Sequence, residues 1–93
     1  MPRFKVAHVR EQGVDLIIVP LESSFGNKSE SDKDEIIAEL QVRARSAGLA
    51  GTVVPVWEAG SRMVFIAPSN WHPFFRSLSI RQIFASVNRE IYW

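Results

Sequence analysis

Two stretches near the N-terminus are dense in valine, isoleucine and leucine and have the length of β-strands. They cover residues 3–11 and 14–21, and a Gln-Gly pair separates them. A two-residue gap containing glycine between such runs predicts a β-hairpin. Residues 52–58 and 61–67 flank an Ala-Gly pair in the same way. We therefore expect two hairpins, one in each half of the chain.

An apolar stripe with helical spacing follows each hairpin. Within residues 33–47 the apolar positions fall in one stripe about 100° wide, and Gly48 marks the end of that helix. Within residues 80–92 they follow the i, i+3, i+4, i+7, i+11 spacing. Asp32 and Ser79 precede the two stretches as capping residues, each with Glu or Gln three positions later. The pattern predicts two helices.

The two halves align without a gap, so that Val6 corresponds to Val53, 47 residues later. The predicted order is β-β-α-β-β-α, a pseudo-repeat of two ββα units at about residues 3–48 and 51–93. The simplest packing of these elements is an α+β fold in which a four-stranded antiparallel sheet carries both helices on one face. We expect residues 1–93 to form a single domain.

Composition narrows the classes of function. Hydrophobic residues make up 46% of the chain and the net charge is +1, which is typical of a folded domain and gives no strong attraction for polyanions. The absence of cysteine excludes disulfides, thiolate nucleophiles and cysteine–zinc sites. No apolar run approaches the roughly 18 residues that a membrane span needs, or forms a signal peptide. These features favour a cytoplasmic protein with no membrane partner, and we expect no cofactor.

Both faces of the predicted hairpins are apolar. An antiparallel sheet with one solvated face should instead alternate apolar and polar residues. Two helices on one side would leave the other face uncovered, and large exposed apolar patches mark interaction surfaces. We therefore expect a homodimer, or else a complex with another protein, formed through the helix-free sheet face. In the alternative, the hairpins curl into a barrel or sandwich that buries both faces within one chain.

The candidate partner-binding residues lie on that face of the sheet. They are His8, Ile17, Val19, Trp57, Arg62, Val64 and Ile66.

Nucleic-acid binding is a second hypothesis. Arg10, Trp57 and Arg62 share one predicted sheet face, with Trp57 directly opposite Arg62, and Arg76 and Arg81 lie near the start of the second helix. An aromatic ring beside arginines can stack on bases and hold phosphate. A cross-strand cation–π pair explains Trp57 and Arg62 without a ligand, and the face is otherwise mostly aliphatic.

The third hypothesis concerns an aromatic loop at residues 69–78, which replaces the polar residues 22–31 of the first half. It predicts a pocket for a small molecule, or a small enzyme in which His72 titrates. The alternative is that these rings anchor the second helix in the core. The candidate ligand-binding residues are Trp71, His72, Phe74 and Arg76.

No motif supplies a catalytic or metal-binding residue. The two histidines and the carboxylates lack the spacing of metal ligands, and no serine lies in a recognisable nucleophile context. Phosphate-binding glycine motifs are also absent. We expect any specific site to lie in the second half, where Trp57 and Trp71 have no counterpart in the first.

Overall fold

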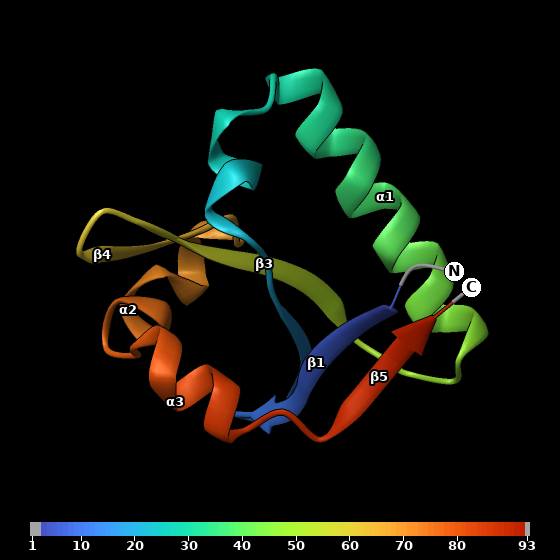
Figure 1. The fold of residues 1–93 in the computed structure, drawn as a ribbon. Helices are drawn as coiled ribbons and strands as arrows, with labels where there is room; N and C mark the ends of the chain where they lie inside the picture. Colours follow the sequence, from blue (N-terminus) through green and yellow to red (C-terminus); the bar gives the residue numbers. More distant parts are fainter. Residues whose placement is uncertain (1–2, 93) are drawn as a thin grey trace.

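A five-stranded sheet lies between two helical layers in the computed structural model, which describes residues 3–92 (Figure 1). The sheet has the order β4-β3-β2-β1-β5, and every neighbouring pair is antiparallel except β2 and β3. The α+β class is confirmed, whereas the expected four strands are five. The elements are β1 (Arg3–Glu11), β2 (Val14–Pro20), the 3-10 helix η1 (Ser23–Asn27), α1 (Glu30–Ser46), β3 (Thr52–Ala59), β4 (Arg62–Phe65), the 3-10 helix η2 (Ser69–Trp71), α2 (His72–Arg76), α3 (Ile80–Ala85) and β5 (Arg89–Tyr92).

The first hairpin has the predicted register, with Glu11 opposite Val14 and Ala7 opposite Ile18. Its turn residue Gln12 has a φ of 51° and is followed by Gly13 with a φ of 76°. Two consecutive positive φ angles are typical of a type I′ turn, whose twist matches that of the flanking strands.

The second hairpin differs from the expected register by two residues. Ala59 lies opposite Arg62 and Trp57 opposite Val64, so the predicted pairing of Trp57 with Arg62 is wrong. Gly60, with a φ of 66°, takes the first central position of its turn, as in a type II′ turn, whereas the glycine of the first hairpin takes the second. A shift of two residues leaves every side chain on its predicted face, because side chains alternate with a period of two.

The first helix, α1, begins three residues earlier than expected. The Ser29 side chain accepts a hydrogen bond from the Asp32 N–H at 3.1 Å, so Ser29 is the cap and Asp32 lies in the first turn. Near the other end, Gln41 donates to the Gly51 carbonyl at 2.9 Å and accepts from the Val53 N–H at 3.0 Å. These two bonds tie α1 to the start of β3.

The chain after α3 forms a strand, so the helix expected to reach residue 92 is wrong beyond Ala85. The Asn88 side chain accepts a hydrogen bond from the His8 N–H at 2.9 Å and donates to the His8 carbonyl at 3.0 Å. It thereby extends the ladder in which Phe4 pairs with Ile91. The first half has no strand after its helix, and this difference accounts for the fifth strand.

The helices cover opposite faces of the sheet, and the expectation that both lie on one face is wrong. Leu40 and Ala44 of α1 pack on one face, while Phe75 of α2 and Ile83 of α3 pack on the other. Because β2 and β3 are parallel, their connection must cross one face, and the connection from β4 to β5 crosses the other. Across residues 3–92, both apolar faces are therefore covered and no helix-free face exists.

Candidate functional site

The predicted partner-binding residues do not share an open surface. Ile17 and Val19 are fully buried beneath α1, and Trp57 is 5% exposed. The His8 ring nitrogen Nε2 lies 2.9 Å from the Ala50 carbonyl oxygen, within hydrogen-bond distance. The remaining three residues lie on β4 or just after it, and they are Arg62 (exposed), Val64 (half-buried) and Ile66 (exposed).

Trp57 anchors η1 to the sheet. Its ring centroid lies 5.0 Å from that of Phe25, and the Lys33 Nζ lies 5.6 Å from the ring on the α1 side. Gly26 is so close that a Cβ there would come within 2.6 Å of the indole Nε1. Because η1 and Lys33 cover the indole, it offers no open ring face beside Arg62 on which a base would stack.

The aromatic loop packs largely into the core. Trp71 is 8% exposed and Phe75 is fully buried against the sheet. The His72 Nε2 lies 3.0 Å from the Ala67 carbonyl oxygen, and the His72 ring packs edge-on to Phe65. Phe74 is half-buried, and Arg76 and Arg81 are exposed on α2 and α3. None of these residues lines the clefts described next.

A wedge opens in the sheet where β1 leaves β2. The β1–β2 register ends at Ala7 opposite Ile18, and the first half of β1 pairs only with β5. If the register continued, Lys5 would lie opposite Pro20, which has no N–H to donate. Proline therefore gives a reason for the ladder to stop, and the first half of β1 diverges from the end of β2.

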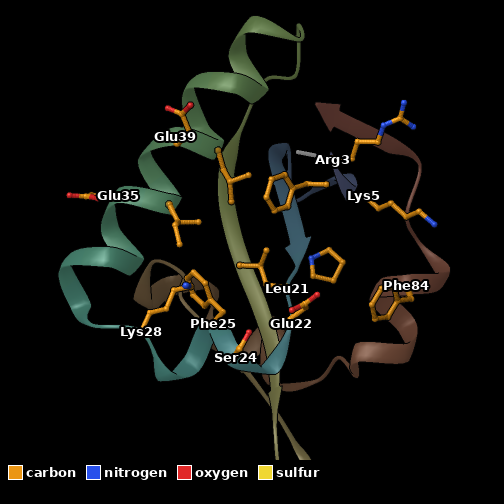
Figure 2. Close-up of a pocket in the computed structure, with 14 residues that line it drawn as sticks. Arg3, Lys5, Leu21, Glu22, Ser24, Phe25, Lys28, Glu35, Glu39 and Phe84 are labelled. Carbon is orange, nitrogen blue, oxygen red and sulfur yellow. The ribbon is translucent and has the colours of Figure 1, made fainter. Parts of the chain in front are cut away.

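The main cleft occupies this wedge and has a volume of about 820 Å³ (Figure 2). Its walls come from α1, from η1 and from the diverging ends of β1 and β2. The size lies within the range of ligand-binding pockets, which are lined mainly by apolar side chains. The apolar lining consists of Phe4, Pro20, Leu21, Phe25, Ile36 and Leu40, with Phe84 of α3 on the far side.

Charges of both signs surround the apolar floor. Figure 2 shows Glu35 and Glu39 on the α1 wall, and Arg3 and Lys5 on the β1 side. Lys28 lies near η1. With Glu22, the described lining residues include three cations and three anions and so carry no excess of either sign.

Two of these charges already have partners on the rim. Glu39 accepts from the Arg43 Nε at 3.0 Å, and the Arg3 guanidinium lies 3.5 Å from the Glu90 carboxylate. Arg3 also lies 5.8 Å from the ring centroid of Tyr92. Within residues 3–92 no ion pair involves Lys5, which leaves its ammonium group available to a ligand.

A smaller hollow of about 280 Å³ continues from the main cleft. The two share the end of β2 at Pro20, Leu21 and Glu22, together with the Phe84 ring. Phe84 is 56% exposed, so its ring is open to a ligand in either hollow. The two hollows therefore form one groove around the end of β2.

The cleft residues were not identified as a site from the sequence. Phe4 and Leu21 lie in the predicted strands at residues 3–11 and 14–21. Strand order decides whether a helix covers them, and the sequence pattern does not give that order. Phe25 gave the clearest signal, as the only aromatic residue in an otherwise polar loop. The cleft is lined mostly by the first half of the chain, whereas a site was expected in the second half.

Neither metal-binding nor membrane-spanning features occur in the described part of the chain. Across residues 3–92, no three histidine or carboxylate side chains group as they would around a metal ion. No helix in that range combines the length and apolarity needed to cross a membrane. Comparison with protein-family models, curated proteins and solved structures finds no match to this chain.

Proposed function

We propose that this protein is a protein-interaction module that binds a short segment of a partner in the cleft between α1, η1 and the diverging ends of β1 and β2. The observation that carries the proposal is the open cleft of about 820 Å³ with an apolar floor. Interaction through a helix-free sheet face no longer applies, because helices cover both faces. Self-association and a cytoplasmic location stay predictions.

The lining of the cleft favours a protein segment over a nucleic acid. The carboxylates of Glu22, Glu35 and Glu39 offset the three cations of the lining, so the cleft offers a phosphate backbone no net attraction. The apolar floor instead matches the apolar side chains with which peptides anchor in grooves.

Selection from a random peptide library tests this function. Peptides of about ten residues, about 33 Å long when extended, match the longest dimension of the domain, 33 Å. We expect the enriched peptides to lose about tenfold or more in affinity for a Ser24→Trp variant. Ser24 is exposed on η1 and its side chain is directed at the cleft (Figure 2), so an indole there would fill the space without disturbing the core.

The matched control is Ser46→Trp, an exposed serine at the end of α1 that does not line the cleft. It should leave affinity unchanged, and circular dichroism should show both variants folded. Failure to enrich any peptide, or equal binding to Ser24→Trp and wild type, would contradict the proposed function.

A further inference from the structure

We infer that the groove selects an extended peptide segment of defined polarity, acidic at one end, apolar in the middle and basic at the other. This inference rests on the proposed function and adds the chemistry of the partner. It is carried by the order of charges along the groove and by main-chain groups that face the wedge.

The end of the groove beside β1 is basic. Lys5 and Arg3 project there, on the side opposite the α1 carboxylates (Figure 2). Lys5 has no ion pair among the described residues, while Arg3 keeps 68% of its side chain exposed despite its contact with Glu90. An acidic residue of the partner would find two cations at this end.

The opposite end of the groove is acidic. The smaller hollow is lined by Glu58 of β3 and by Glu22, which it shares with the main cleft, and none of its described lining residues is a cation. Neither carboxylate has an ion pair within residues 3–92. A lysine or arginine of the partner would therefore be favoured at this end.

Apolar groups connect the two ends. Leu21 and Phe84 line both hollows, and Ile80 of α3 lines the smaller one. An aliphatic or aromatic side chain in the middle of the segment would cover the exposed ring of Phe84. A ligand that reaches from Lys5 to Glu58 has to pass these apolar residues, and an extended segment can do so.

Main-chain groups of β1 favour a peptide as that molecule. The Val6 carbonyl accepts from the Asn88 N–H, and the His8 N–H and carbonyl bond to the Asn88 side chain, so these residues point toward β5. Successive residues of an antiparallel strand point to opposite sides, which directs the N–H and carbonyl of Lys5 toward the wedge. An extended peptide can bond to both groups, as in strand addition.

The test repeats the library selection with charge-reversed proteins as bait. In Lys5→Glu the basic end is reversed, and in Glu58→Lys the acidic end is reversed; both side chains are exposed. Peptides enriched on wild type should carry Asp or Glu at one end and Lys or Arg at the other. Each reversal should invert the preferred charge at its own end only. Because exposed ion pairs are weak, a single mismatched charge should change affinity about two- to fivefold, and less at high salt.

Arg45→Glu is the control, because Arg45 is an exposed cation of α1 outside the groove. It should leave the charge preference as in wild type. If peptides bind the cleft, and are blocked by Ser24→Trp, but show the same charge pattern on every bait, the inference is wrong while the proposed function stands. If no enriched peptide is blocked by Ser24→Trp, both are wrong.

Discussion

A single glycine sets how closely η1 approaches the sheet. A Cβ at Gly26 would lie 2.6 Å from the Trp57 Nε1, well inside van der Waals contact, and the indole is only 5% exposed and has little room to move. We expect Gly26→Ala to lower the free energy of unfolding by about 1–3 kcal/mol through overpacking. Urea denaturation measures the change. In a Trp57→Phe background the smaller ring should relieve most of the cost, and an unchanged cost there would show that the contact is not its cause.

Glycines also show how far residue-level prediction reaches. Gly13 and Gly60 were both placed in two-residue turns, and both have positive φ angles. The register of the second hairpin was nevertheless wrong, because a glycine is favourable at the first central position of a type II′ turn and at the second of a type I′ turn. The sequence Ala59–Gly60–Ser61 is compatible with either, and cross-strand packing decides between them.

At the scale of elements, one amide side chain fixes the start of β5 against β1. Asn88 supplies an acceptor to the His8 N–H and a donor to the His8 carbonyl, which joins α3 to the edge of β1. In Asn88→Asp the donor becomes a second acceptor, so a carboxylate oxygen would face the carbonyl. We expect a loss of about 0.5–1.5 kcal/mol in the free energy of unfolding, measured in urea at pH 7. The exposed Asn70, whose side chain makes no hydrogen bond among the described residues, is the control. Asn70→Asp should change stability by less than about 0.5 kcal/mol, and equal losses at both positions would contradict this role.

The same segment explains why the second helix was predicted too long. Val87 and Ile91 continue the helical spacing of residues 80–84, but residues 89–92 also contain strand-forming residues. The local sequence pattern is therefore compatible with either a helix or a strand. The open edge of β1 decides the outcome, because β5 pairs on the side of β1 that faces away from β2. Such a contact, between residues far apart in the chain, is not visible in a window of neighbouring residues.

At the scale of the whole molecule, strand order separates what the sequence predicts from what it does not. Both hairpins were expected to be apolar on both faces, and both faces are indeed buried. The explanation for the second apolar face was wrong. We expected a free interaction face there, and a second helical layer covers it instead. Near-continuous apolar strands are typical of sheets covered on both sides, as around the parallel pair β2 and β3. The cleft depends on the same strand order, so it could not be located before the strands were placed.

The two helical layers share one sheet, so the molecule should unfold as a single unit. Leu40 of α1 is 1% exposed and packs on Val19 and neighbouring residues of one sheet face. We expect Leu40→Ala to lower the free energy of unfolding by about 2–5 kcal/mol. Two of the three tryptophans lie on opposite faces, Trp57 beside η1 and Trp71 at the start of α2, and each reports on its own layer.

In a Trp93→Phe background, Trp71→Phe leaves Trp57 as the only reporter, and Trp57→Phe leaves Trp71. Each reporter variant should show coincident urea midpoints by its own tryptophan fluorescence and by far-ultraviolet circular dichroism, as two-state unfolding requires. Adding Leu40→Ala should lower the stability measured by Trp71 as much as that measured by Trp57, although Leu40 lies across the sheet from Trp71. A change confined to Trp57 would mean that the α1 layer opens independently. The cleft beneath α1 would then belong to the less stable part of the fold.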